Sequence, residues 1–236
     1  MLSEVKALTF DVFGTVVDWR GSIVREGERL ARERSIRADW GAFADRWRGR
    51  YQPGLEEVRA GRRPWTNLDV LHQESLDQLT PEFGLEGLDE AERAHLNRVW
   101  HRLDPWPDSV EGLRRLKRRF ILATLSNGHV ALMVNMARHA GLPWDAVLGA
   151  EVAQGYKPQP QVYLTTARLL GLQPHECMMT AAHPYDLEAA RELGFRTAYV
   201  HRPLEFGPER EPERPRPGTF DAMADSFTEL AEKLGV

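Results

Sequence analysis

Near its amino terminus the chain reads Val5-Lys6-Ala7-Leu8-Thr9-Phe10-Asp11, and Val12-Phe13-Gly14-Thr15 follows directly. The first run is short and mostly apolar, which is typical of a buried strand, and it ends in the carboxylate of Asp11. Gly14 permits a tight turn immediately afterwards. The residues therefore predict a strand that carries an acidic side chain at its carboxyl end.

From residue 104 onward, short aliphatic runs alternate with stretches of helical spacing. This alternation predicts parallel βαβ units with right-handed crossovers. The predicted fold class is α/β, with a doubly wound (Rossmann-like) parallel sheet that the strand before Asp11 must join. We expect strands at residues 120–125, 146–149, 178–182 and 197–201, and helices after residue 108 and at residues 129–140, 159–170, 184–193 and 226–234.

Residues 20–103 have a different character, because they are rich in arginine, glutamate, tryptophan and leucine at helical spacing. We expect about four helices and no strand here, with Ser22 and Asp39 as N-caps and breaks at Pro53-Gly54 and Pro64. Residues 203–217 are rich in proline, glutamate and arginine, which predicts a solvated connecting loop. The predicted domains are an α/β core of residues 1–17 and 104–236 and an inserted helical cap of residues 18–103.

The composition excludes several classes of protein. The chain has 236 residues with 42% hydrophobic and 28% charged residues, as in ordinary globular proteins. Its single cysteine, Cys177, excludes an internal disulfide and a cysteine-based metal cluster. The net charge of −4 argues against binding nucleic acid. The sequence has no apolar run long enough to span a membrane and no signal-peptide pattern, so we expect a cytoplasmic protein.

Polar residues follow each predicted strand of the core. Asp11 follows the first strand, Ser126-Asn127-Gly128 the second, Tyr156-Lys157-Pro158 lies near the third, and Asp186 lies beyond the fourth. Ligands of open parallel sheets bind beyond the carboxyl ends of the strands. Two carboxylates, one amine and one hydroxyl are therefore expected to meet at one edge of the sheet.

Taken together and in this order, these motifs resemble the haloacid dehalogenase superfamily, and within it the L-2-haloacid dehalogenase (type II) branch. The resemblance covers nearly the whole chain, including the helical insert. Phe13 stands where phosphatases of the superfamily have a second aspartate, and Ala181-Ala182 stands where they commonly have Gly-Asp. Only one carboxylate remains in that last motif, so we predict no catalytic metal and no cofactor.

The resemblance implies a set of catalytic roles that the chemistry of the residues supports. Asp11 would be the nucleophile, and a neighbouring Lys157 would keep it ionised. Asp186, paired with Lys157, would position or activate the water that hydrolyses the resulting ester. Thr15 belongs to the same catalytic set.

The remaining expected contacts concern the substrate. Ser126 and Asn127, with the start of the helix after them, would bind the substrate carboxylate. The resemblance places Arg48 of the Trp47-Arg48 pair at the departing halide and Phe13 and Tyr163 in the site. Trp65 is expected either as an aromatic wall of the pocket or as part of the cap core. His183 departs from the branch, and it could bond the water, line the halide pocket or fill space.

The leading hypothesis is hydrolytic dehalogenation of a small-molecule substrate, a short 2-haloacid. A single inversion would convert an L-2-haloacid into a D-2-hydroxyacid. A phosphatase using the same aspartate and a non-catalytic binding protein on this scaffold are the alternatives. The cap helices could also supply a homodimer face.

Overall fold

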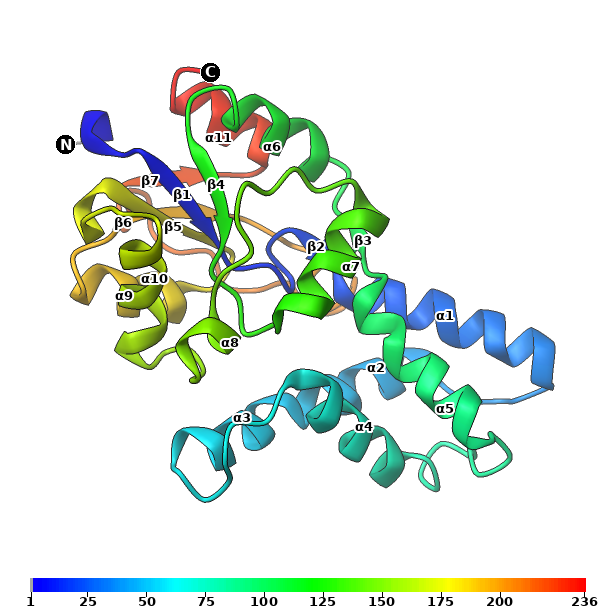
Figure 1. Ribbon diagram of the computed structural model, residues 1–236. Coiled ribbons are helices and arrows are strands. Elements are labelled where there is room, and N and C mark those ends of the chain that lie inside the picture. Colours follow the sequence, from blue (N-terminus) through cyan, green and yellow to red (C-terminus); the bar gives the residue numbers. More distant parts are fainter. Residues whose placement is uncertain (1) are drawn as a thin grey trace.

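The computed structural model describes residues 2–236. Its core is a five-stranded parallel sheet with the order β4-β1-β5-β6-β7 (Figure 1). The interior strand β1 pairs with β4 on one side and β5 on the other, so that Ala7 lies opposite Ile121 and Cys177. The predicted α/β fold class is confirmed. The strands are β1 (Ala7–Phe10), β4 (Ile121–Thr124), β5 (Cys177–Ala181), β6 (Arg196–Val200) and β7 (Ala222–Ala224).

Helices cover both faces of this sheet, because successive strand residues point to opposite sides. Leu8 and Phe10 of β1 belong to the apolar cluster that includes residues of α6, α7 and α11, whereas Ala7 belongs to the cluster with α9 and α10. The helices are α6 (Ser109–Leu116), α7 (Val130–Ala140), α8 (Ala150–Ala153), α9 (Pro160–Leu169), α10 (Pro184–Glu192) and α11 (Phe227–Lys233).

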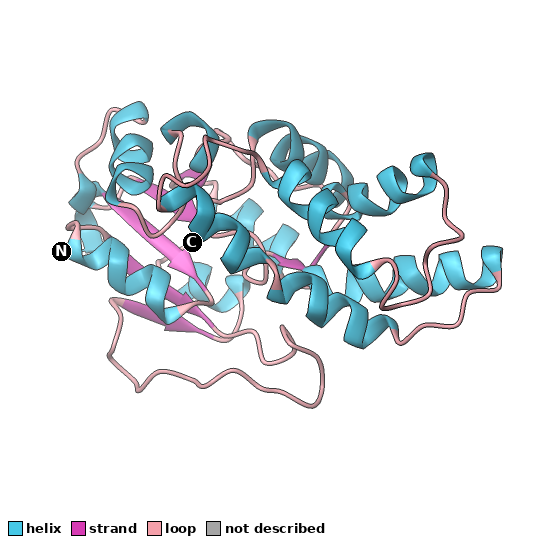
Figure 2. Ribbon diagram, turned by 90° about the horizontal axis from the view of Figure 1, so that it is seen from below, coloured by secondary structure: helices cyan, strands magenta, loops and turns pink. Residues whose placement is uncertain are grey.

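The insert is helical, as predicted, and it extends to one side of the sheet (Figures 1 and 2). The chain leaves and re-enters the core through a short antiparallel pair, in which Val17 lies opposite Pro105. The pair is β2 (Val17–Asp18) and β3 (Asp104–Pro105), and between them lie α1 (Trp19–Arg34), α2 (Trp40–Gly49), α3 (Tyr51–Arg59), α4 (Leu68–Leu79), α5 (Glu90–Asn97) and the 3-10 turn η2 (Arg98–His101).

Two expected helix boundaries in the insert are wrong. Asp18, not Ser22, is the N-cap of α1, and its carboxylate accepts the Gly21 N–H. Ser22 lies in the first turn, where its hydroxyl donates to the Asp18 carbonyl oxygen. Pro53-Gly54 lies inside α3, because a proline in the first turn needs no N–H of its own. Asp39 caps α2 as predicted.

The core also differs from expectation in its loops. Residues 146–149 form no strand of their own, because Ala146 makes an isolated bridge to Ala123 of β4 and Gly149 makes another to Ser126, just beyond that strand. The short strand β7 and the one-turn α8 were not predicted. The segment after β6 contains no helix, but it is not wholly solvated, because Glu205 within it is only 1% exposed.

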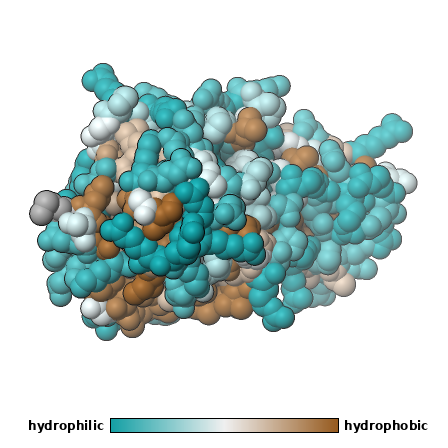
Figure 3. Space-filling model, turned by 90° about the horizontal axis from the view of Figure 1, so that it is seen from above, coloured by the Kyte–Doolittle hydropathy of each residue, from teal (hydrophilic) through white to brown (hydrophobic). Residues whose placement is uncertain are grey.

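The surface seen in Figure 3 is largely hydrophilic, with hydrophobic residues in separate patches. Separate apolar side chains are normal on a protein surface. Within residues 2–236, no helix has both the length and the apolar character needed to cross a membrane.

Candidate active site

Asp11 lies directly after β1 at the carboxyl edge of the sheet, and it is almost fully buried. The Gly14 turn, with a φ of 83°, brings Thr15 back over it. The Thr15 hydroxyl donates to Asp11 Oδ2 at 2.6 Å and accepts the Ala182 N–H at 2.9 Å. One carboxylate oxygen of Asp11 is therefore tied to the segments that follow β1 and β5.

Lys157 places its ammonium group between two carboxylates. Its Nζ lies 3.0 Å from Asp11 Oδ1, and it also donates to Asp186 Oδ2. Burial alone would lower the pKa of this ammonium, but the two carboxylates raise it above its ordinary value. The Lys157 backbone N–H donates to the side-chain oxygen of Asn127 at 2.8 Å, which holds the loop of Lys157 against that of Asn127.

The two buried carboxylates are driven in opposite directions. Burial favours the neutral form of Asp11, but Lys157 and His183 outweigh it and hold the pKa of Asp11 well below its usual range. Burial and the charge of Asp11 raise the pKa of Asp186, although Lys157 and the Tyr163 hydroxyl, which donates at 2.6 Å, partly offset this. Asp11 is thus suited to remain an anion, whereas Asp186 is the more basic group.

His183 joins Asp11 to a third carboxylate. Its Nδ1 lies 2.9 Å from Asp11 Oδ2, and its Nε2 lies 2.9 Å from Glu205 Oε1. The indole N–H of Trp19 also donates to Glu205. Glu205 was missed in the sequence because its segment is rich in proline and charge. Its position five residues after the end of β6, at the same sheet edge, was the available signal.

Arg48 brings a positive charge to the aromatic floor of the site. Its guanidinium carbon lies 4.1 Å from the centre of the Tyr51 ring, 5.5 Å from that of Trp19 and 5.9 Å from that of Phe13. The buried Nη1 of Arg48 has no hydrogen-bond partner among the described residues. A buried cationic donor without a partner is suited to receive an anion.

Three other predicted residues have contacts of a different kind. Ser126 is fully buried, and its hydroxyl oxygen accepts the Gly128 N–H at 3.1 Å. The Asn127 amide nitrogen donates to the Tyr51 hydroxyl at 3.0 Å, which links core to cap. Trp65 packs on Tyr156, with ring centres 4.8 Å apart, so its observed partner is not one of the catalytic residues.

Two cavities reach these residues. One, of about 640 Å³, is lined by Lys157, Asn127 and Tyr185 together with Arg59 of the cap. The other, of about 680 Å³, reaches Arg48. Its wall also includes Trp19, Phe206 and Arg210, so the segment after β6 forms part of it. Lys157 and Arg48 are therefore each accessible from a cavity.

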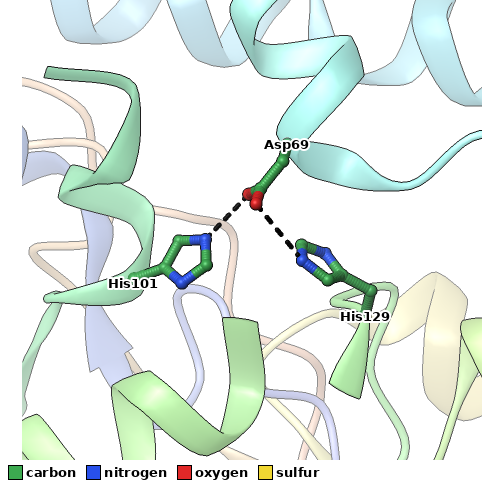
Figure 4. Close-up of side chains that lie close together, drawn as sticks. All are labelled: Asp69, His101 and His129. Atoms are coloured by element: carbon green, nitrogen blue, oxygen red, sulfur yellow. Dashed lines mark hydrogen bonds and ion pairs between the residues drawn. The ribbon is translucent and has the colours of Figure 1, made fainter. Parts of the chain in front are cut away.

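A second polar cluster lies at the contact between cap and core, where Asp69 of α4 points between His101 and His129 (Figure 4). The Asp69 carboxylate lies 2.8 Å from His101 Nε2 and 3.4 Å from His129 Nε2. Partial burial would raise the pKa of Asp69, but the two histidines hold it below its usual range. These three groups could hold a metal ion. However, the Asn135 amide nitrogen donates to His101 Nδ1, so the ring hydrogen of His101 lies on Nε2 and is donated to Asp69.

Comparison with known proteins agrees with this geometry. The family model of haloacid dehalogenase-like hydrolases matches residues 5–194. The (S)-2-haloacid dehalogenase of Pseudomonas sp. (strain YL) is 30% identical over 207 residues, which cover 85% of this chain and 84% of that protein. Two solved structures are each similar over 98% of this chain. The L-2-haloacid dehalogenase PA0810 is 48% identical and matches over 98% of its own chain with a TM-score of 0.93. The defluorinating L-2-haloacid dehalogenase Rha0230 is 45% identical and matches over 96% of its own chain with a TM-score of 0.94. The chain therefore belongs to the haloacid dehalogenase-like hydrolase family.

Proposed function

We propose that the protein is a hydrolytic dehalogenase that converts short 2-haloacids, haloacetates or L-2-haloalkanoates, into 2-hydroxyacids and halide. The observation that carries the proposal is the buried Asp11, held as an anion beside Lys157, together with Arg48, whose guanidinium has a buried Nη1 without a partner among the described residues and lies 5.9 Å from the centre of the Phe13 ring. A nucleophile and an anion acceptor in one partly apolar site fit displacement of a halide from carbon. The names of the similar proteins point to the same class of substrate.

The first step is displacement of the halide by Asp11. Oδ1 of Asp11 attacks the carbon that bears the halogen, the carbon–halogen bond breaks with its electron pair, and an ester forms. Arg48 receives the departing halide, and Phe13 and Tyr51 exclude water from it. Because attack occurs opposite the leaving group, the configuration at that carbon inverts once.

The second step is hydrolysis of the Asp11 ester. Asp186 takes a proton from a water molecule, which attacks the carboxyl carbon of Asp11 rather than the substrate carbon. The raised pKa of Asp186 suits it to this role, and Tyr163 and Lys157 hold its orientation. No second inversion occurs, so an L-2-haloacid gives a D-2-hydroxyacid.

The substrate carboxylate needs donors near Asp11. We assign this role to Ser126 with the backbone at the start of α7 and to the amide of Asn127, which would exchange its bond to Tyr51 for the substrate. Trp65, which packs on Tyr156, would shape the wall further out.

The arrangement speaks against the two alternatives. Phosphatase chemistry needs oxygen ligands for a hard cation, whereas the Asp11 and Asp186 carboxylates already face the ammonium of Lys157. Phe13 offers no acid for an alkoxide leaving group. A binding protein without catalysis would have no need of a buried carboxylate held as an anion beside a more basic one.

Halide release tests the proposal. Fluoroacetate, chloroacetate and the L and D forms of 2-chloropropionate are incubated with the wild type, with Asp11→Asn and with Asp77→Asn, an exposed cap control, all in the presence of EDTA. We expect EDTA-resistant release that Asp11→Asn abolishes and Asp77→Asn preserves. Release of phosphate from a phosphate ester only when Mg²⁺ is added, with no halide from any acid, would establish the phosphatase instead.

We extend the proposal to the organisation of the chain. The short pair β2–β3 supports a boundary that assigns residues 1–17 and 104–236 to the core and residues 18–103 to the cap. A homodimer, a cytoplasmic location and the lack of a nucleic-acid partner stay predictions.

A further inference from the structure

His183 and Glu205 have no part in the two steps above, yet they form a buried chain of contacts to the nucleophile. The His183 ring lies 2.9 Å from Asp11 at one nitrogen and 2.9 Å from Glu205 at the other. The side chain of Glu205 is 1% exposed and that of His183 is 12% exposed. Gly14 lies so close to Glu205 that an added Cβ would approach Oε1 to 2.2 Å.

The contacts distinguish the two oxygens of Asp11. Oδ2 accepts hydrogen bonds from the Thr15 hydroxyl and from the His183 ring, whereas Oδ1 contacts only the Lys157 ammonium among the described side chains. The less occupied Oδ1 is the oxygen free to attack. After attack, Oδ2 is the carbonyl oxygen of the ester, and it already has two donors.

We propose that His183 is a catalytic residue of ester hydrolysis, in which its Nδ1–H stabilises the oxyanion that forms on Oδ2 of Asp11, and that Glu205 is a positioning residue that keeps the ring oriented and protonated. This inference rests on the proposed function and adds a named donor to its second step. The two-donor arrangement with Thr15 has the geometry of an oxyanion hole.

The electrons and protons of the step balance as follows. Water adds to the carboxyl carbon of Asp11, Asp186 takes one proton, and the carbonyl electron pair moves onto Oδ2, where His183 and Thr15 donate to it. The pair then returns, the bond from the carboxyl carbon to Oδ1 breaks, and the hydroxyacid leaves with Oδ1 and the proton from Asp186. Asp11 keeps the oxygen of water and releases the second proton.

Glu205 matters most after the first step, when Asp11 has lost its charge in the ester. In the free enzyme, burial alone would lower the pKa of His183, but Glu205 and Asp11 together raise it to about 10. The other group against the ring is Tyr185, with ring centres 5.6 Å apart. Once Asp11 is esterified, Glu205 is the carboxylate that still contacts the ring and favours its protonated form.

The geometry argues against a role for His183 as the base. Its Nδ1 faces the carboxylate of Asp11 and its Nε2 faces Glu205, so neither nitrogen presents a free lone pair to a water molecule. Each oxygen of Asp186 also accepts a hydrogen bond, from Lys157 or Tyr163, but a carboxylate oxygen keeps a second lone pair that can take a proton from water.

The test separates the two steps with chloroacetate. Rapid-quench measurements give the first-turnover burst of chloride, and mass spectrometry of the quenched protein gives the fraction that carries a carboxymethyl ester on Asp11. For His183→Gln we expect a burst near the wild-type rate, accumulation of the ester, and turnover lower by about 10²–10³-fold. Glu213→Gln, an exposed change in the same loop, is the control and should match the wild type.

Glu205→Gln gives an independent readout that a merely structural role would not produce. Its hydrolysis step should slow as the pH rises through a value at or below about 6.5, the ordinary imidazole pKa, because burial without Glu205 lowers the pKa of His183. The wild-type step should not show this loss near pH 6.5. An unchanged pH profile in Glu205→Gln would overturn the inference, even if His183→Gln failed to fold.

Loss of the burst and turnover in equal measure, with no ester, would also overturn the inference while leaving the proposed function intact. A wild-type enzyme that releases no halide would instead refute the proposed function itself.

Discussion

Replacing Arg48 by methionine should strongly lower activity without weakening the fold. Arg48 carries a buried Nη1 with no partner among residues 2–236, so its charge is a cost in the absence of an anion. Methionine keeps much of the length of the side chain and its apolar contact with the rings of Trp19 and Tyr51. We therefore attribute the presence of Arg48 at this position to the binding of an anionic ligand rather than to a contribution to the stability of the fold.

The magnitude follows from two opposing contributions. An unsatisfied buried donor costs about 1–3 kcal/mol, which the substitution removes. The contact of the guanidinium with the Tyr51 ring, at 4.1 Å, contributes about 0.5–2 kcal/mol, which the substitution loses. The two nearly cancel, so we expect a free energy of unfolding within about 1 kcal/mol of the wild type, or roughly 2–4 °C in Tm. Halide release should fall by about 10²–10³-fold, as when one stabilising donor is removed from a transition state.

The assay combines urea unfolding with halide release from chloroacetate. Arg46→Met is the matched control, because Arg46 lies two residues earlier on α2 and forms an exposed ion pair with Glu82. It should retain activity. A loss of more than about 2 kcal/mol in Arg48→Met would show that Arg48 is mainly structural. Halide release at the wild-type rate would refute its assignment to the leaving halide.

Three further predictions concern Gly14, Asp69 and His183. Gly14→Ala should lower the free energy of unfolding by at least about 1–2 kcal/mol and impair activity, because its φ is 83° and its Cβ would displace Glu205. The control is Gly61→Ala, which has a φ of 69° and open space around it, and which should be strained but active. Equal activity of the two variants would contradict this account. Asp69→Asn should lower the free energy of unfolding in urea by about 1 kcal/mol, because one acceptor to His101 or His129 is lost, and unchanged stability would show that the cluster does not hold cap to core. The raised pKa of His183 means that the folded state retains a proton which the unfolded state releases, so its stabilising contribution is complete below about pH 6.5 and is lost as the pH rises through about 10. The free energy of unfolding in urea should therefore decline over this pH range in the wild type, and the decline should be smaller in His183→Gln. Equal declines in the two proteins would contradict the raised pKa.

Much of the core was predictable because its signals are local. The apolar run before Asp11 and the alternating pattern after residue 104 predict strands and helices, and the rule that ligands bind at the carboxyl edge of a parallel sheet brings Asp11, Lys157 and Asp186 together before any coordinates are known. The structure places the Lys157 ammonium in contact with both carboxylates.

What was not predictable depends on competition or on long-range packing. Asp18 and Ser22 are both good caps, and their sequence does not show that the helix starts at the earlier one. Residues 146–149 have strand-like character but pair at single positions, so tertiary context decides their state. Glu205 lies in a segment whose composition indicates solvent, and only the packing of that segment against Gly14 and Trp19 buries it.

The central claim is that halide is displaced by Asp11 and that water then attacks Asp11 rather than the substrate. A single turnover in water labelled with heavy oxygen, with enzyme in excess over L-2-chloropropionate, tests it most directly. We predict that the first D-lactate formed carries unlabelled oxygen and that mass spectrometry finds the label in the peptide that contains Asp11. Label in the hydroxyacid from the first turnover, with none in Asp11, would contradict the account, because it would mean that water attacks the substrate carbon directly.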